Sequence, residues 1–172
     1  MRPGLKLAAL FAACAAPFVL GWAAFEFQWI SGRTSNYGEL LKPQPVDGAL
    51  APLRGKWVLL TADGATCSAA CERKLYIVRQ VRKAQGKEAE RIERLWLVTD
   101  GGRPRAELVA ALDGGQLATP SAALMQSLPG APLEHIYLVD PLGNLMMRFP
   151  AEADPQKMIK DLQRLLKYSS FG

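Results

Sequence analysis

An uncharged, apolar run of nineteen residues near the N-terminus constrains this chain more than any other feature. The run extends over Leu7–Phe25, with Arg2 and Lys6 before it and Glu26 directly after it. A helix of this length, at a rise of about 1.5 Å per residue, approaches the ~30 Å thickness of the hydrocarbon core of a bilayer. We therefore expect residues 7–26 to form a single transmembrane anchor.

Two other roles for this segment are a cleaved signal peptide and a lipoprotein signal. The apolar region of a signal peptide is shorter and ends at small residues, whereas this run continues into the aromatic residues Trp22, Phe25, Phe27 and Trp29. Cys14 is preceded by too little apolar sequence for a lipidation site. The length therefore favours a retained anchor, in which Cys14 is a small apolar residue within the membrane.

The charges that flank the run predict its orientation. The positive-inside rule places residues 1–6 in the cytoplasm and the chain after Glu26 on the other side of the membrane. No Arg- and Ser-rich transit peptide is present, so we expect the inner membrane of a bacterium, with the soluble part facing the periplasm. This topology separates the soluble part from nucleic acid. In the periplasm, a pair of thiols persists only if it is oxidised or binds a metal.

The chain after the anchor divides into a linker and one domain. Residues 27–53 are rich in proline and glycine and show little periodicity, which is typical of a linker. The whole chain is 49% hydrophobic and 22% charged, so residues 54–172 have the composition to bury a core.

The pattern of this domain alternates between strands and helices. We expect strands at 56–62, 95–99, 135–140 and 145–149, the last two joined in a hairpin, and helices at 67–86, 107–112, 121–128 and from 155 onwards. Asp154 is placed to cap the last helix and Pro155 to open it. The order predicts an α/β fold with a mixed central sheet flanked by helices.

The chain has three cysteines and one histidine, so few residues can support redox or metal chemistry. With Cys14 in the membrane, that chemistry depends on Cys67, Cys71 and His135. If Cys67 begins the helix, both sulfurs lie on one side of it, and the helix N-terminus lowers their pKa values. Two thiolates and an imidazole form a soft site that suits Cu(I), or a tetragonal Cu(II) site if a further ligand is added.

Other interpretations of the three residues remain open. If Cys67 lies just before the regular helix, the same two thiols can close a disulfide, which is either redox-active or an inert structural link. His135 directly precedes an apolar strand, so it lies at one end of the sheet. It is a candidate ligand only if the topology brings that end to the cysteines.

Three segments around these residues resemble motifs of a known family. Thr66-Cys67-Ser68-Ala69-Ala70-Cys71 follows the first strand, Asp100–Pro104 follows the second, and Glu134-His135-Ile136 leads through a strand to Asp140–Gly143. Their order and spacing resemble the Sco/SenC copper chaperones of cytochrome c oxidase assembly, which are membrane-anchored proteins with a thioredoxin-like fold. The resemblance covers about residues 53–167, although neither cysteine is followed by the proline of the family motif.

This resemblance implies a thioredoxin-like sheet, copper as the metal, and Cys67, Cys71 and His135 as its ligands. It also implies that the protein delivers copper to the copper-site subunit of cytochrome c oxidase or to another assembly factor. One alternative is a thiol-disulfide oxidoreductase that acts on oxidase or cytochrome cysteines, with Cys67 as nucleophile and Cys71 as resolving thiol. The other is a non-catalytic scaffold tethered to the membrane. A metallochaperone is favoured over an enzyme.

The basic residues are concentrated in one segment. Eight Lys and Arg lie between residues 73 and 94, against three Glu. We expect a solvated helix face there, and the alternative is electrostatic docking to an acidic partner or to anionic headgroups. The eight residues are Arg73, Lys74, Arg79, Arg82, Lys83, Lys87, Arg91 and Arg94.

Overall fold

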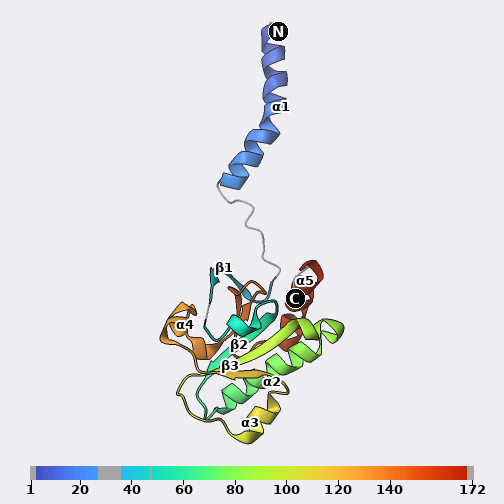
Figure 1. Cartoon of the computed structure of the whole chain (residues 1–172). Coiled ribbons are helices and arrows are strands. Elements are labelled where there is room, and N and C mark those ends of the chain that lie inside the picture. The colour runs from blue at the N-terminus through green and yellow to red at the C-terminus, as the bar shows by residue number, and fades with distance from the viewer. Residues whose placement is uncertain (1–2, 27–35, 47, 170–172) are drawn as a thin grey trace. The chain divides into compact units, whose positions relative to one another are not determined.

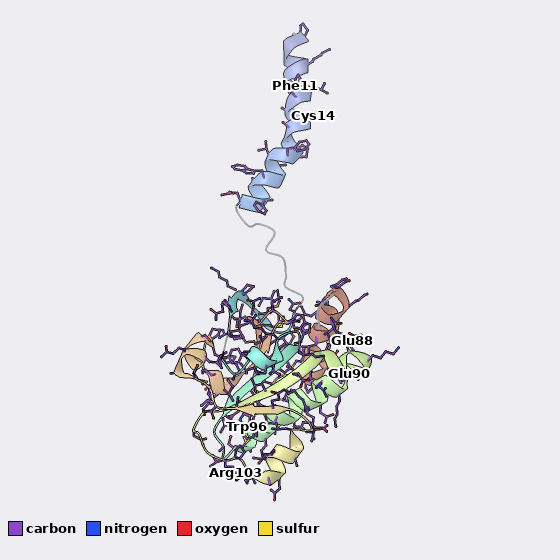
Figure 2. The ribbon with its side chains drawn as sticks, viewed as in Figure 1. Phe11, Cys14, Glu88, Glu90, Trp96 and Arg103 are labelled. Carbon is purple, nitrogen blue, oxygen red and sulfur yellow. A yellow bond between two sulfur atoms is a disulfide. The ribbon has the colours of Figure 1, made fainter. Side chains whose placement is uncertain are left out.

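The computed structural model describes residues 3–26, 36–46 and 48–169, which belong to two separate units. The first unit contains the helix α1 (Pro3–Glu26), which continues through Pro17. Its segment Ala9–Glu26 has a mean hydropathy of 1.6 and no buried residues, so it is long and apolar enough to cross a membrane. Phe11 and Cys14 project from the helix surface (Figure 2).

The second unit is a six-stranded mixed sheet with helices against it (Figure 1). The strand order is β1-β6-β5-β2-β3-β4, in which β2, β3 and β4 are parallel and the other neighbours are antiparallel. The predicted α/β mixed sheet is therefore confirmed. The strands are β1 (Glu39–Pro45), β2 (Trp57–Asp63), β3 (Ile92–Val98), β4 (Gln116–Ala118), β5 (His135–Val139) and β6 (Asn144–Pro150).

Helices and short 3-10 segments connect the strands. Asp154 caps the last helix by accepting hydrogen bonds from the backbone N–H groups of Gln156 and Lys157, as the sequence predicts. The α-helices are α2 (Ala69–Lys83), α3 (Ala106–Ala111), α4 (Ala122–Ser127) and α5 (Pro155–Tyr168), and the 3-10 segments are η1 (Ala51–Leu53), η2 (Gly86–Arg91) and η3 (Pro132–Glu134).

The prediction that the linker extends to residue 53 is wrong. The segment Glu39–Pro45 forms β1, which pairs with β6 at the edge of the sheet, and Val46, Leu50 and Leu53 are buried in the core. Proline is tolerated in an edge strand, where one side of the backbone needs no partner, so the prolines of this segment do not prevent pairing. The domain therefore begins near Asn36, and residues 27–35 of the predicted linker lie outside the described residues.

The two faces of the sheet bury separate hydrophobic clusters. Alternate residues of each strand point to opposite faces. On one face, Leu59, Ile136 and Leu138 pack with residues of α2 and α5. On the other face, Leu60 and Tyr137 pack with residues of η1 and α4. This alternation decides on which side of the sheet each candidate site residue lies.

Candidate functional site

The two cysteines lie where β2 ends and α2 begins. Cys67 has a positive φ of 47°, and its N–H donates to the carbonyl of Gly64 at 3.1 Å. The N-cap of α2 is Ser68, whose hydroxyl accepts from the N–H of Cys71 at 3.4 Å. Cys67 therefore stands just outside the regular helix, and its sulfur forms a disulfide with Cys71, with the two Cα atoms 5.2 Å apart. Of the two arrangements that the sequence allowed for Cys67 and Cys71, the structure therefore contains the disulfide.

The disulfide is buried in a hydrophobic cluster of its own. Cys67 is 6% exposed and Cys71 is 1% exposed, so the small contact with solvent is mainly at Cys67. The indole of Trp96, on β3, packs in the same cluster (Figure 2). The other members are Ala65, Leu75, Val98, Leu108 and Leu112. Of the two cysteines, Cys67 is therefore the more accessible residue.

The turn before Cys67 is held by the carboxylate of Asp100. This carboxylate accepts hydrogen bonds from the N–H groups of Ala65 and Gly102, each at 3.0 Å. These bonds favour the charged form and hold the pKa of Asp100 below its usual value. Gly64 has no room for a side chain, because an added Cβ would meet the Asp100 carboxylate at 2.8 Å. Asp100 therefore positions the turn that presents Cys67.

A buried lysine joins α2 to two segments at the same end of the sheet. Lys74 is 1% exposed, and its ammonium lies 2.6 Å from the carboxylate of Asp63. The ammonium also donates to the carbonyl of Ala62 at 3.2 Å and to the carbonyl of Leu133 in η3. Burial raises the pKa of Asp63 despite the opposing effect of Lys74. The helix of Cys71 and the turn before His135 are therefore tied to the end of β2.

His135 begins β5 at the cysteine end of the sheet. Because β5 runs antiparallel to β2 with Ile136 opposite Thr61, the start of β5 lies beside the end of β2. The His135 ring contacts the carbonyl of Ala131 through Nδ1 at 2.9 Å. A carbonyl only accepts, so Nδ1 carries the proton of the neutral ring and Nε2 keeps its lone pair. A metal-ligating histidine commonly has this arrangement.

The loop before His135 is fixed on the face of the sheet opposite to α2. The hydroxyl of Tyr137 and the guanidinium of Arg148 both donate to the carbonyl of Pro129, at 2.9 and 3.1 Å. Burial raises the pKa of Tyr137 to about 12, so this hydroxyl remains a donor. The rings of His135 and Tyr137 lie 5.9 Å apart on this face.

The structure thus brings two of the three predicted site residues together. Cys67 and Cys71 are joined on the face covered by α2, whereas His135 shares the other face with Tyr137 because the two are two residues apart in a strand. Within residues 3–26, 36–46 and 48–169, no three His, Cys, Asp or Glu side chains form a group that could hold a metal ion. The donor set itself, two sulfurs and an imidazole, suits Cu(I). Its use as a copper site stays a prediction.

Lys74 and Asp63 were not identified from the sequence as part of the site. Lys74 was expected on the solvated basic face, but both it and Arg94 are buried. A signal was present, because Lys74 lies three residues after Cys71 and three before Ile77, on the apolar stripe of α2. A charged residue in such a stripe indicates a buried ion pair.

The segment from β2 to α5, with the disulfide at the start of α2, is the part of the chain that matches a known family. A family model described as "Transmembrane-like, thioredoxin-like, C-terminal domain" matches residues 57–169. The chain belongs to this family. The match begins at the first residue of β2 and ends just after α5, so it contains both cysteines and His135. A sequence comparison with the curated proteins gives no match.

Solved structures of several Sco proteins and of a DsbF homologue share the fold. Apo Sco1 from Thermus thermophilus is 21% identical, with a TM-score of 0.58 over 78% of this chain and 99% of that one. Copper-bound yeast Sco1 is 14% identical, with a TM-score of 0.58 over 80% and 96%. A DsbF homologue from Corynebacterium diphtheriae is 17% identical, with a TM-score of 0.55 over 77% and 96%. The likeness to Sco proteins that the sequence indicated is confirmed for the fold.

Proposed function

We propose that the protein is a membrane-anchored copper-binding assembly factor whose cysteines cycle between a disulfide and a dithiol. The observation that carries the proposal is the Cys67–Cys71 disulfide at the start of α2, with His135 at the same end of the sheet. The disulfide accepts two electrons and two protons from a thiol reductant and becomes two thiols. Cu(I) then replaces the thiol protons, and the imidazole of His135 completes the ligand set.

Copper is the cargo in this proposal, and the protein delivers it to the copper-site subunit of cytochrome c oxidase. The anchor α1 keeps the domain at the membrane that contains the oxidase, and the domain faces the periplasm. The burial of Cys71 and the contact of Cys67 with solvent support transfer through Cys67, the sulfur that a partner meets first. Because His135 lies on the opposite face of the sheet from the sulfurs, its imidazole must move around the end of the sheet to bind the same copper ion. His135 directly follows η3, in which the carbonyl of Leu133 accepts a hydrogen bond from Lys74.

Deletion of the gene tests the delivery step. Membranes of the deletion strain are expected to contain oxidase with less copper per haem, and the complete chain restores the ratio. The variant Cys67→Ser/Cys71→Ser should fail to restore it, while Cys14→Ser, which leaves the disulfide intact, should restore it fully. An oxidase with normal copper content in the deletion strain would contradict delivery.

A thiol-disulfide oxidoreductase is the second candidate, and the buried disulfide itself favours it. In the reductive direction, the Cys67 thiolate attacks a substrate disulfide and releases one substrate thiolate. The Cys71 thiolate then attacks the Cys67 sulfur, closes the Cys67–Cys71 bond and releases the second substrate thiolate. His135 has no role in this sequence, so substrate reduction by the variant His135→Ala at the normal rate distinguishes it from copper delivery.

A further inference from the structure

The exposed face of α5 carries a continuous row of positive charges. Lys157, Lys160, Arg164 and Lys167 follow one another at intervals of three, four and three residues, and all four are exposed. Because this spacing keeps side chains on one face of a helix, the four cations form a stripe of about 15 Å along α5. We call these four residues the α5 stripe.

Within residues 36–46 and 48–169, Lys157 is the one lysine of the α5 stripe with a carboxylate at ion-pair distance. Asp161 is the one acidic residue within α5, and it is buried and accepts hydrogen bonds from the N–H groups of Tyr37 and Gly38. Asp154 lies 3.7 Å from Lys157 at the start of the helix. Glu88 lines a hollow together with Lys167, but its carboxylate pairs with Arg91. The lysines of the α5 stripe therefore keep a net positive charge among the described residues.

The basic segment 73–94 does not offer a similar surface, although it has more cations. Lys74 and Arg94 are buried, and Lys83 pairs with Asp113 at 2.6 Å. Three more of its residues donate to backbone carbonyls: Arg79 to Ala111, Arg82 to Ile92 and Arg91 to Leu166 and Ser169. Most of the cationic side chains that the sequence concentrates there are therefore buried or engaged in contacts within the fold.

Apolar side chains lie at the C-terminal end of the α5 stripe. A hollow of about 360 Å³ is lined by apolar and aromatic residues that include Trp57, Leu142, Leu165 and Tyr168, together with the charged residues Arg164 and Asp140. Tyr168 is 79% exposed and Leu142 is 58% exposed. Cations beside exposed tyrosine and leucine side chains are typical of surfaces that rest at the headgroup level of a bilayer.

The start of the domain is attached to the same helix. The Tyr37 hydroxyl accepts from the N–H of Asp154, and the ammonium of Lys157 lies 5.3 Å from the centre of the Tyr37 ring. Residues 27–36 separate Tyr37 from the end of α1 at Glu26, and these ten residues span at most about 36 Å. If α1 spans the membrane, this length limits how far Tyr37 and the attached start of α5 can move from the end of the anchor.

From this we infer that the α5 stripe docks on the anionic phospholipid headgroups of the membrane that holds α1. This inference depends on the anchor in the proposed function but not on copper. The short connection raises the effective concentration of lipid at α5, and the stripe and its apolar end supply the attraction. Docking would fix the direction in which the domain presents its cysteine end.

The test is lysine acylation of the complete chain in lipid nanodiscs, followed by mass spectrometry. Nanodiscs of phosphatidylcholine are compared with discs in which about one lipid in four is phosphatidylglycerol. In the anionic discs, Lys157, Lys160 and Lys167 should react at least about three-fold more slowly. The protection should disappear in about 0.5 M NaCl, where screening shortens electrostatic attraction to a few ångströms. Lys83, towards the β4 edge of the sheet, should react alike in both discs.

Two variants sharpen the result. Lys160→Glu/Lys167→Glu should remove the protection of the remaining Lys157, whereas Lys83→Glu should leave it unchanged. Equal acylation rates in both discs with α1 embedded would overturn the docking and leave the anchor standing. Loss of the chain from the discs would overturn the anchor and the docking together, without bearing on the Cu(I) affinity of the dithiol.

Discussion

The ammonium of Lys74 lies 2.6 Å from the carboxylate of Asp63, the last residue of β2, at the end of the sheet where the disulfide lies. The same ammonium donates to the carbonyl of Leu133, two residues before His135. One buried side chain therefore connects the helix of Cys71, the strand before Cys67 and the turn before His135. This connection explains how elements that are distant in the sequence keep a common geometry at the candidate site.

Lys74→Met should be among the most destabilising single changes in the domain. It leaves the Asp63 carboxylate, which is 13% exposed, without its partner and frees the carbonyls of Ala62 and Leu133. We expect a loss of roughly 2–4 kcal/mol in the free energy of unfolding, measured with urea. The matched control is Lys83→Met, whose pair with Asp113 is about half exposed and should matter far less. Equal losses in the two variants would contradict the role of Lys74.

The loss in the free energy of unfolding that Lys74→Met causes should depend on pH. Burial already raises the pKa of Asp63, and without the ammonium it should rise further. A raised pKa in the folded state means that the folded state binds more protons, so stability falls as the pH increases through that range. Urea melts between about pH 4 and pH 7 should therefore show a deficit that grows with pH. A deficit that is constant or shrinks with pH would indicate that the lost carbonyl contacts dominate.

Asp100→Asn should weaken the turn before Cys67 and lower the free energy of unfolding. This loss should also depend on pH, because Asp100 has a lowered pKa whereas Asp63 has a raised one. The pKa of Asp100 is held below the ordinary value of 3.8 by the N–H groups of Gly102 and Ala65. Its contribution to stability is therefore complete above that value and is lost as the pH falls through the lowered pKa. The stability curves of the wild type and the variant should converge as the pH falls through this lowered pKa, as thermal melts would show. A gap that persists there would contradict this role.

Ser68→Ala should destabilise the domain and expose the disulfide. It removes the side-chain cap that accepts from the N–H of Cys71, which typically costs about 1 kcal/mol. Ser121→Ala is the matched control, because Ser121 caps α4 through the N–H of Leu124 in the same way. Both variants should lose similar stability, but only Ser68→Ala should be reduced faster by dithiothreitol. Equal reduction rates in the two variants would show that Ser68 contributes only to stability.

Reduction of the disulfide should cost little stability. The bond closes a loop of only five residues, from Cys67 to Cys71, so the chain-entropy contribution is at most about 2 kcal/mol. The domain has two other hydrophobic clusters that do not contain the cysteines, and it should stay folded as a dithiol. Near-ultraviolet circular dichroism with and without reductant measures this. Unfolding on reduction would instead support the scaffold, in which the disulfide serves only as a structural link.

The sequence predicted the central part of the fold because the patterns there are strong. The apolar runs that became β2, β3 and β5 and the cap of α5 at Asp154 were identified correctly. Strand β1 was missed because the prolines in Glu39–Pro45 remove backbone donors, and only its edge position makes pairing possible. Strand β4 has three residues, too few for a periodic signal.

The site was predicted less completely, for a different reason. The residues Cys67, Cys71 and His135 were the only candidates, and the sequence predicted correctly that Cys67 could close a disulfide if it preceded the helix. The face on which His135 lies depends on the strand register, because a shift of one residue reverses it. Register follows from tertiary packing, so the separation of the imidazole from the sulfurs could not be derived from spacing.

Titration of the reduced chain with Cu(I) against a chromophoric chelator is the most direct measurement of copper binding. The fully reduced protein should take one Cu(I) per chain, and His135→Ala should weaken the affinity at least about ten-fold while keeping both thiols. The matched control Tyr137→Phe removes the hydrogen bond to Pro129 but no ligand, and should bind within about two-fold of the wild type. Failure of the reduced wild type to compete for Cu(I), or equal affinity in His135→Ala, would contradict the proposed copper site.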